Sequence, residues 1–261
     1  MEANVAKKGE RGSLIGVAST VSGILTLIIA VPLVIYGDAF TSDILLLILS
    51  GSFLSFVFTL ICVWPIKTKV EVKESQENPF RLNFNATIYK FIFVRGLFVH
   101  SALVAPYFML EKSDEVQELL PIYIGAEALA ALLSSIIWGK LADKSAKLTL
   151  RLSGVLALSA CIGLLVSESS SIFTSALLFF ILSVAHAGVR TGRKTYSLDV
   201  KEGQGRTELV GFSNTAIGLI LLGFGALYAA LTPILTFSVV YIMSGMLFCA
   251  IIASVILPDE K

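Results

Sequence analysis

Charged side chains are scarce in this chain. Only 15% of its 261 residues are Asp, Glu, Lys or Arg, whereas a typical soluble domain carries about a quarter of its residues as charges. Apolar residues make up 56% of the sequence, which is more than a water-soluble core can hold. The composition therefore excludes an ordinary soluble domain and predicts a protein whose solvent is the lipid bilayer.

Cysteine pairs and enzyme motifs are also lacking. The three cysteines, Cys62, Cys161 and Cys249, lie in or at the ends of apolar runs, with no CxxC pair and no nearby histidine. This pattern predicts neither a disulfide framework nor a zinc site. Because the sequence contains no GxSxG, HExxH or GxxxxGK[ST] motif, we expect no membrane enzyme. We also expect no cofactor, no metal and no nucleic acid partner.

Long apolar runs dominate what is present. A helix needs about 20 consecutive apolar residues to cross the roughly 30 Å hydrocarbon core of a bilayer. Eight such runs occur, at 14–36, 44–64, 87–110, 119–138, 148–166, 172–189, 209–231 and 235–257. They are too long for strands and do not alternate, so only helices satisfy their backbone polar groups in lipid. The sequence predicts an all-α polytopic membrane protein with about eight transmembrane helices.

Lysine and arginine concentrate before the first run and in every second loop. These residues are Lys7, Lys8, Arg11, Lys67, Lys69, Lys73, Arg81, Lys140, Lys144, Lys147, Arg190, Arg193, Lys194, Lys201 and Arg206. The intervening loops are acidic or uncharged and hold one basic residue, Lys112. The positive-inside rule then places the basic side and both termini in the cytoplasm. No signal-peptide cleavage site follows the charged residues 1–13. We expect a multi-pass protein of the inner (plasma) membrane.

The longest polar stretch separates the first two runs from the other six. Its lysines could attract anionic lipid headgroups, but Glu71, Glu74 and Glu77 offset most of that attraction. A solvated cytoplasmic linker is therefore favoured. The predicted organisation is two membrane helices in residues 1–66, a linker in 67–86 and a six-helix unit in 87–261.

Two motifs on the basic side carry a family resemblance. Residues 139–147 read GKLADKSAK and resemble the loop signature G-x-L-A-D-[RK]-x-G-[RK] of the major facilitator superfamily of transporters, with Ala146 where glycine is usual. The second stretch is similar to the segment that joins the tenth and eleventh helices of such transporters. Its matching residues are Arg190, Arg193, Asp199, Arg206, Asn214 and Thr215.

The resemblance covers nearly the whole chain. It aligns residues 87–261 with the seventh to twelfth helices of the family and residues 1–66 with the fifth and sixth. It implies that this sequence corresponds to the C-terminal two-thirds of a transporter. The first four helices and the first copy of the loop signature have no counterpart in it.

The resemblance implies a gating role for the first motif, at Gly139, Leu141, Asp143, Lys144 and Lys147. Asp143 can accept hydrogen bonds from backbone N–H groups at a neighbouring helix start and pair with a basic residue, which would hold the cytoplasmic side shut. The candidate basic partners are Lys144, Arg151, Arg193 and Arg206. The simpler alternative is a helix turn with a capping aspartate.

Ionisable residues inside the runs are costly, about 2.5 to 3.5 kcal/mol each on insertion scales, and are therefore candidate site residues. His100 lies about 18 Å from the cytoplasmic start of the third run, and Glu127 lies about 12 Å from the outer start of the fourth run. Both are near mid-depth on adjacent runs and could share a proton or a solute. The alternative is that both are satisfied packing residues. Arg95 can instead extend toward the interface, and Asn214 can line a cavity or bond between helices. His186 is expected to be interfacial.

Three functions are compatible with these residues. The first is secondary transport of a small solute by alternating access, with protons as a candidate coupling ion, which the resemblance favours. The second is a membrane enzyme, which the absent motifs disfavour. The third is a membrane scaffold or the subunit of a split transporter, in which a second copy or a separate N-terminal half supplies the missing wall.

Overall fold

The computed structural model describes residues 7, 9–35, 42–64, 86–110, 116–167, 171–200 and 203–259, and all regular structure in these ranges is helical. The helices are α2 (Arg11–Ile35), α3 (Ser42–Val63), α4 (Ala86–Phe98), α5 (His100–Leu103), α6 (Ala105–Leu110), α7 (Val116–Lys144), α8 (Ala146–Val166), α9 (Ile172–Asp199), α10 (Gly203–Leu231), α11 (Val240–Ala253) and the 3-10 helix η3 (Ser254–Ile256). The all-α prediction is confirmed. Residues 67–85 of the predicted linker lie outside the described residues.

Six helical segments in the described residues are long and apolar enough to cross a membrane. They are Arg11–Ile28, Ala86–Phe108, Leu120–Lys144, Ala146–Val166, Ile172–Asp199 and Leu209–Leu231. The other two predicted runs coincide with the shorter apolar helices Leu49–Cys62 and Val240–Ile256. The fold therefore has the helices that a multi-pass membrane protein requires.

The third predicted run is interrupted by irregular turns at Val99 and Val104, which divide it into α4, α5 and α6, although the backbone angles of both residues stay helical. Pro106 has no N–H to donate to the carbonyl four residues earlier, which weakens the turn before it. The Nδ1 atom of His100 lies 2.8 Å from the Leu97 carbonyl oxygen, so this side chain competes for a backbone acceptor. Hydrogen bonds across three residues, from the Ala102 N–H to the Val99 carbonyl oxygen and from the Tyr107 N–H to the Val104 carbonyl oxygen, tighten both turns, and Ala86–Phe108 still forms one apolar span.

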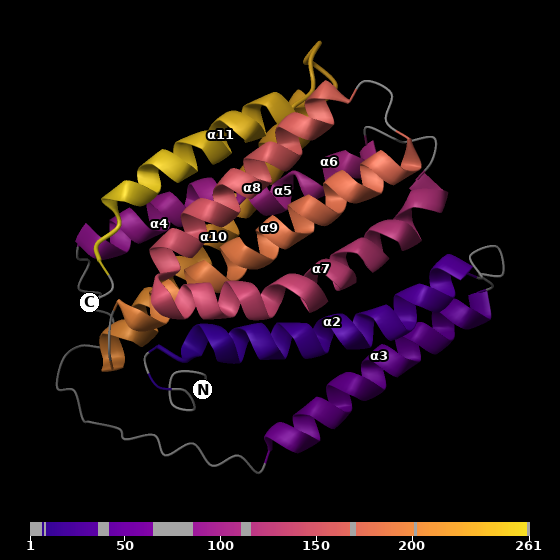
Figure 1. Ribbon diagram of the computed structural model, residues 1–261, viewed down its shortest axis with the longest axis horizontal. Helices are drawn as coiled ribbons and strands as arrows, with labels where there is room; N and C mark the ends of the chain where they lie inside the picture. Colours follow the sequence, from indigo (N-terminus) through magenta and orange to yellow (C-terminus); the bar gives the residue numbers. More distant parts are fainter. Residues whose placement is uncertain are drawn as a thin grey trace.

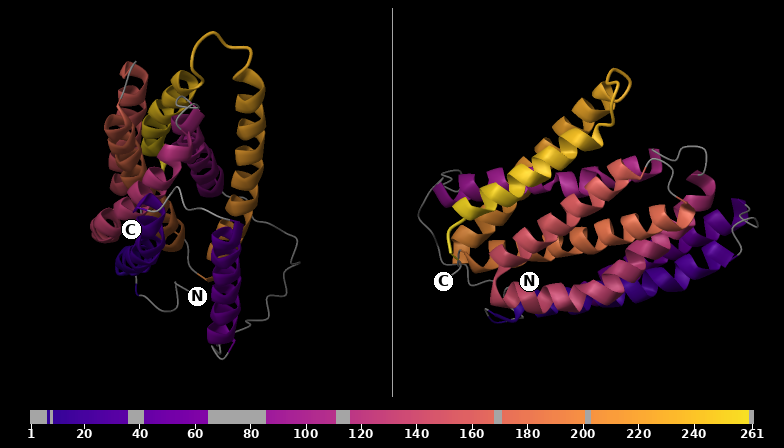
Figure 2. Two further views of the ribbon diagram at one scale, coloured as in Figure 1. Left: turned by 90° about the vertical axis from the view of Figure 1, so that its right-hand side faces the viewer. Right: turned by 45° about the horizontal axis from the view of Figure 1, so that its top comes forward.

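Most helices pack as neighbours in one bundle (Figure 1). Helix α2 lies along α7, α7 packs on α9, α9 on α8, and α11 bridges α8 and α4. Figure 2 shows the pairing of α2 with α7 from a second direction. One apolar core surrounds Phe108, Tyr123 and Phe179. A second core surrounds Phe91 and Tyr196, whose rings stack 5.3 Å apart.

Helix α3 lies apart from this bundle (Figure 1), and all of its described side chains are exposed. Phe53, Phe56 and Leu60 are 68%, 78% and 67% exposed. Lipid tails are as apolar as these side chains. A bilayer would therefore accommodate this surface, whereas water would not.

The contact between α2 and α7 is built from small residues. A Cβ added at Gly16 would lie 2.5 Å from the Ser135 carbonyl oxygen, and one at Gly23 would lie 2.9 Å from the Ala128 carbonyl oxygen. At Gly139 it would lie 2.6 Å from the Gly12 carbonyl oxygen. The two backbones thus touch almost directly, as in membrane helix pairs with small residues at every fourth position.

Candidate functional site

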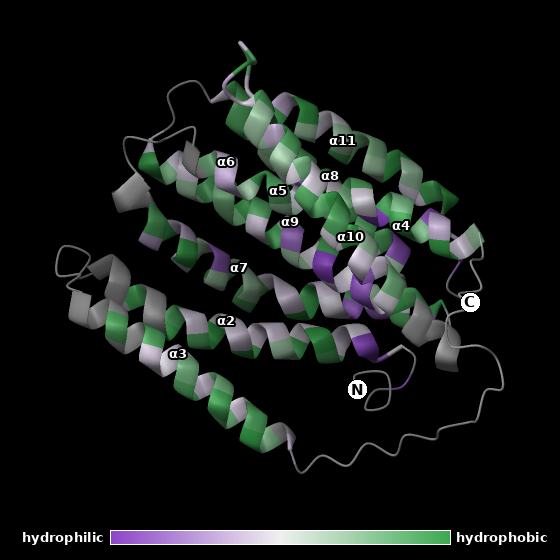
Figure 3. Cartoon of the chain, turned by 180° about the vertical axis from the view of Figure 1, so that it is seen from behind, coloured by the Kyte–Doolittle hydropathy of each residue, from purple (hydrophilic) through white to green (hydrophobic). Residues whose placement is uncertain are grey.

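Polar residues gather at one end of the bundle, where α2, α8 and α10 begin and α7 and α9 end (Figures 1 and 3). We call this the basic end. It carries Arg11, Lys140, Lys144, Lys147 and Lys194. The start of α2 and the segment around Asp259 lie at this same end. The described basic residues that were expected to share one side therefore lie at one end of the folded bundle.

Asp143, near the end of α7, binds the start of α2. Its Oδ1 accepts a hydrogen bond from the Gly12 N–H at 2.7 Å, and its Oδ2 accepts one from the Ser13 N–H at 2.9 Å and one from the Ser13 hydroxyl. The first N–H groups of a helix have no partner within the helix and carry a partial positive charge. The Asp143 carboxylate accepts hydrogen bonds from two of these N–H groups and places a negative charge beside the positive end of α2. The predicted hydrogen bonds to a neighbouring helix start are confirmed, and the helix concerned is α2.

A second acidic residue holds the same helix start. Arg11 Nη1 lies 2.5 Å from Asp199 Oδ1 at the end of α9 and donates to the Leu198 carbonyl oxygen at 2.8 Å. Both partners of this ion pair are largely buried, with side-chain exposures of 9% and 7%. We refer to the contacts of Asp143 and Asp199 with residues 11–13 as the α2 latch.

The basic partner predicted for Asp143 is not among the described candidates. No ion pair within 4 Å joins Asp143 to a described basic side chain, and Arg151 Nε instead donates to the Ser254 hydroxyl at 3.0 Å. The Arg206 side chain lies outside the described residues. The donors at the start of α2 already satisfy three acceptor positions of the carboxylate and stabilise its charge.

The other residues of the loop motif have distinct positions. Gly139 is buried against Gly12, and Leu141 is half-buried. Lys144 is exposed at the end of α7. Lys147 donates from Nζ to the Leu257 carbonyl oxygen at 2.6 Å and lies 3.4 Å from Asp259, so it ties the start of α8 to the C-terminal segment.

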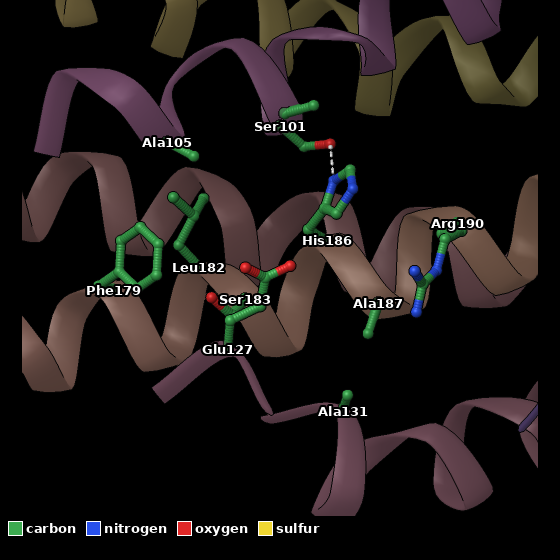
Figure 4. A pocket seen from close by; sticks show the side chains of 11 residues that line it. Ser101, Ala105, Glu127, Ala131, Phe179, Leu182, Ser183, His186, Ala187 and Arg190 are labelled. Carbon is green, nitrogen blue, oxygen red and sulfur yellow. Dashed lines mark hydrogen bonds between the residues drawn. The ribbon is translucent and has the colours of Figure 1, made fainter. Parts of the chain in front are cut away.

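A cavity of about 230 Å³ lies in the middle of the bundle, between α5, the start of α6, α7 and α9 (Figure 4). Its polar lining consists of Ser101, Glu127, Ser183, His186 and Arg190. Phe179 and Leu182 line the opposite end from Arg190. Pockets for drug-sized ligands measure about 300 to 1,000 Å³, so this cavity suits a small solute.

Glu127 reaches this cavity from α7. Figure 4 shows its carboxylate pointing toward Ser183 and His186 on α9. The side chain is exposed to the cavity, and no hydrogen bond joins it to the described residues. His186 Nδ1 lies 3.3 Å from the Ser101 hydroxyl oxygen. An acidic group, a histidine and two hydroxyl groups therefore face one small volume.

His100 does not join Glu127. Its ring is fully buried and is held by the Leu97 carbonyl oxygen at 2.8 Å and the Tyr228 hydroxyl oxygen at 2.7 Å. The Phe224 ring lies 4.8 Å from it, edge to face. Both ring nitrogens are thus occupied within the protein. The packing alternative for His100 agrees with this geometry, and the histidine that faces the cavity with Glu127 is His186.

Because both ring nitrogens of His100 are bound within the protein, removing one of its partners should change the stability of the fold. We expect Tyr228→Phe to leave the buried Nε2 atom of His100 without a partner, at a cost of about 1 to 3 kcal/mol. The measured quantity is the melting temperature of the purified protein in detergent. Tyr241→Phe is the control, because Tyr241 is exposed. Equal melting temperatures for both variants would contradict the assignment.

Arg95 and Asn214 are brought together by the structure. Arg95 Nη2 donates to Asn214 Oδ1 at 2.7 Å, and Nη1 donates to the Ser213 hydroxyl at 2.9 Å. The Arg95 guanidinium also lies over the Phe91 ring, 6.0 Å from its centroid. These contacts link α4 to α10 and do not line the main cavity. They fit the bonding between helices that was one alternative for Asn214.

Arg190 and Arg193 lie on α9 rather than in a loop. Arg190 lines the cavity and donates from Nη2 to the Ser19 hydroxyl of α2 at 3.5 Å. Arg193 lines a smaller cavity together with Arg95. Asp199, from the same motif, belongs to the α2 latch. The segment predicted as a cytoplasmic connection is therefore largely the last turns of a long helix.

Sequence reasoning missed the lining formed by α9. Ser183, His186 and Arg190 are spaced by three and four residues, which places them on one helix face. The same face carries Phe179 and Ala187. This spacing can be found in the sequence. The sequence alone does not show that α9 continues to Asp199, which places His186 about 20 Å from the basic end and not at the interface.

No known family model matches the sequence, and no curated protein matches it. No three His, Cys, Asp or Glu residues in the described part of the chain gather in a way that could hold a metal ion. A functional proposal for this chain rests on its own residues and geometry, together with the motifs at 139–147 and 190–215.

Proposed function

We propose that this chain acts in secondary active transport of a small solute across a membrane by alternating access, as its resemblance to the major facilitator superfamily implies. The observation that carries the proposal is the cavity lined by Glu127, His186 and Arg190. Ionisable residues inside a membrane span are costly and are retained where they serve a pathway. Three such residues around one cavity fit a solute site near the middle of the bilayer.

The α2 latch supports a gated pathway. The positive-inside rule assigns the basic end to the cytoplasm. There α2 is fastened to α7 and α9 by hydrogen bonds and one ion pair rather than by interlocking side chains. Polar contacts of this kind can be exchanged for water as the helices part. In the proposed cycle the latch closes the cytoplasmic side and releases when the cavity opens there.

The direct test is solute uptake into proteoliposomes that contain the purified chain. We expect at least one small solute from a radiolabelled panel to accumulate in a time-dependent manner, and protein-free liposomes to show no accumulation. Vesicles are assayed with and without an imposed pH gradient. If a chain that melts cooperatively accumulates none of the solutes, the proposal of transport by this chain fails.

Proton coupling is assigned to Glu127 within this proposal. Ser101 faces it from α5, and Ser183, His186 and Arg190 face it from α9. A carboxylate in this position can gain and lose a proton during the cycle, whereas an amide cannot. We expect Glu127→Gln to abolish the stimulation of uptake by a pH gradient while downhill exchange of solute persists.

The controls for this variant are Glu127→Asp and Asp259→Asn. Glu127→Asp keeps a titratable group at the cavity, so stimulation by the gradient should be retained. Asp259 has a side chain that is 87% exposed and lies outside the cavity. Undiminished stimulation in Glu127→Gln would exclude this carboxylate as the coupling group.

A further inference from the structure

Three arginines lie close together inside the bundle. Arg190 and Arg193 are one turn apart on α9, and their positive charges act on each other. Arg193 also acts electrostatically on Arg95 of α4 and on His186. An arginine guanidinium remains charged under all ordinary conditions. The group is therefore a fixed concentration of positive charge, with Arg190 at the main cavity and Arg193 and Arg95 at the smaller one.

These guanidinium groups have no acidic partner among the described residues. The ion pairs found there involve Arg11 and Lys147 instead. The Nε atoms of Arg95 and Arg190 are buried and have no hydrogen-bond partner. The remaining contacts of Arg95 and Arg190 are to neutral Ser and Asn side chains. The three side chains are half-buried, and charges withdrawn from solvent are normally paired, so this arrangement leaves a positive charge that no carboxylate of the described residues pairs with.

The cavity is where a balancing charge can bind. Arg190 lies at one end of it, beside His186 and Ser101. The rise of an α-helix places Arg190 about 14 Å from the basic end, deeper than lipid headgroups normally reach. Glu127 supplies one negative charge farther along the cavity, against the three arginines. The local potential at the Arg190 end is therefore positive.

We infer that the solute is a small organic anion, and that its carboxylate or phosphate group binds at the Arg190 end of the cavity beside His186 and Ser101. This inference rests on the proposed transport function and names the substrate class of the same site. Arg190 acts as the direct ligand, since its fork of N–H donors fits an oxyanion. Arg193 and Arg95 add to the attraction from outside the cavity.

Binding can be measured without knowing the natural solute. The chain contains two tryptophans, and Trp138 donates from Nε1 to the Val184 carbonyl oxygen of α9 at 2.8 Å. Trp64→Phe leaves Trp138 as the sole fluorescent reporter near the cavity. The full chain is placed in discs of phosphatidylcholine, which bears no net charge, and titrated with lactate, inorganic phosphate or glycerol 3-phosphate. Lactamide and glycerol are the neutral counterparts.

We expect at least one of the anions to change Trp138 fluorescence and raise the melting temperature, and its neutral counterpart to do neither at the same concentration. Response to lactate alone identifies a carboxylate, and response to the phosphate compounds identifies a phosphate group. Arg190→Gln should weaken anion binding about tenfold or more, as expected for losing a hydrogen bond to a charged group. Arg190→Lys should retain part of it.

Lys90→Gln is the matched control, because it removes one positive charge from an exposed side chain of α4. The inference is overturned if the neutral compounds bind as tightly as the anions, or if Arg190→Gln binds the anions as tightly as the parent chain does. It is also overturned if no anion binds at the highest concentration tested. Anion binding without uptake would overturn transport and leave the anion site standing. Uptake of only neutral or cationic solutes would support transport and overturn the anion site.

Discussion

Replacing Asp143 with asparagine is expected to open the basic end of the bundle. The carboxylate accepts three hydrogen bonds from Gly12 and Ser13, whereas an asparagine has one oxygen and turns an NH₂ group toward the remaining donors. Hydrogen bonds to charged groups contribute about 1.5 to 3 kcal/mol each. Losing one of them should shift the balance between latched and released states about tenfold or more.

The shift can be followed at Ser135, which lies under the latch on α7. Ser135 is fully buried against Gly16 of α2, so a cysteine there should react with a membrane-impermeant maleimide only when α2 separates from α7. The background carries Cys62→Ser and Cys249→Ser, because both of these cysteines are exposed, while Cys161 is buried. Ser135→Cys should be modified about tenfold faster when Asp143→Asn is added.

Asp259→Asn is the matched control for this experiment. Asp259 is also an acidic residue at the basic end and pairs with Lys147 at 3.4 Å, but its side chain is 87% exposed. Exposed ion pairs contribute little, so the labelling rate should not change. If Asp143→Asn labels no faster than this control, the carboxylate of Asp143 does not hold α2 in place.

The second large effect is expected at Gly139. A Cβ at this position would lie 2.6 Å from the Gly12 carbonyl oxygen and 3.1 Å from the Ser13 Cα. Both contacts are with main-chain atoms, so no side-chain rotation can relieve them. Gly139→Ala must push α2 away from α7, at a cost of about 1 to 3 kcal/mol for overpacking. The melting temperature should fall, and labelling at Ser135→Cys should rise.

Gly218→Ala provides a control with the opposite expected sign. Gly218 is also a helical glycine, but a Cβ added there would meet nothing within 4 Å. Alanine favours a helix over glycine by about 1 kcal/mol, so this variant should melt at the same or a higher temperature. A similar fall in both variants would show that glycine itself, rather than the close approach of α2 and α7, is required.

The helices themselves could be predicted from the sequence because the signal is local. A run of about 20 apolar residues leaves the backbone no alternative to a helix in lipid. The irregular turns at Val99 and Val104 could not be placed in the same way, because they accompany a bond between His100 and the Leu97 carbonyl oxygen that forms only in the folded helix, as well as Pro106. The beginning of the last helix at Val240, five residues after the predicted start, likewise reflects a local turn in which Ser238 Oγ accepts the Val240 N–H.

The candidate site was predicted only in part, because it depends on which helices become neighbours. The loop motif correctly indicated that Asp143 binds a helix start, but nothing local in the sequence pointed to α2 and Arg11. Glu127 and His100 were matched by depth along their helices. Depth does not specify the direction in which a side chain points around its helix axis. The structure pairs His100 with Tyr228 and turns His186 toward Glu127 instead.

The irregular turns between α4, α5 and α6 have a consequence for solute selection. One wall of the cavity, at Ser101, Ala102 and Ala105, lies between and beside the two irregular turns at Val99 and Val104. The backbone stays helical there, but part of its bonding spans three residues rather than four, and a short stretch of this kind inside a helix often marks a hinge. The wall can therefore adjust to anions of different length while Arg190, on the unbroken α9, keeps its position. Charge would be selected strictly and shape loosely.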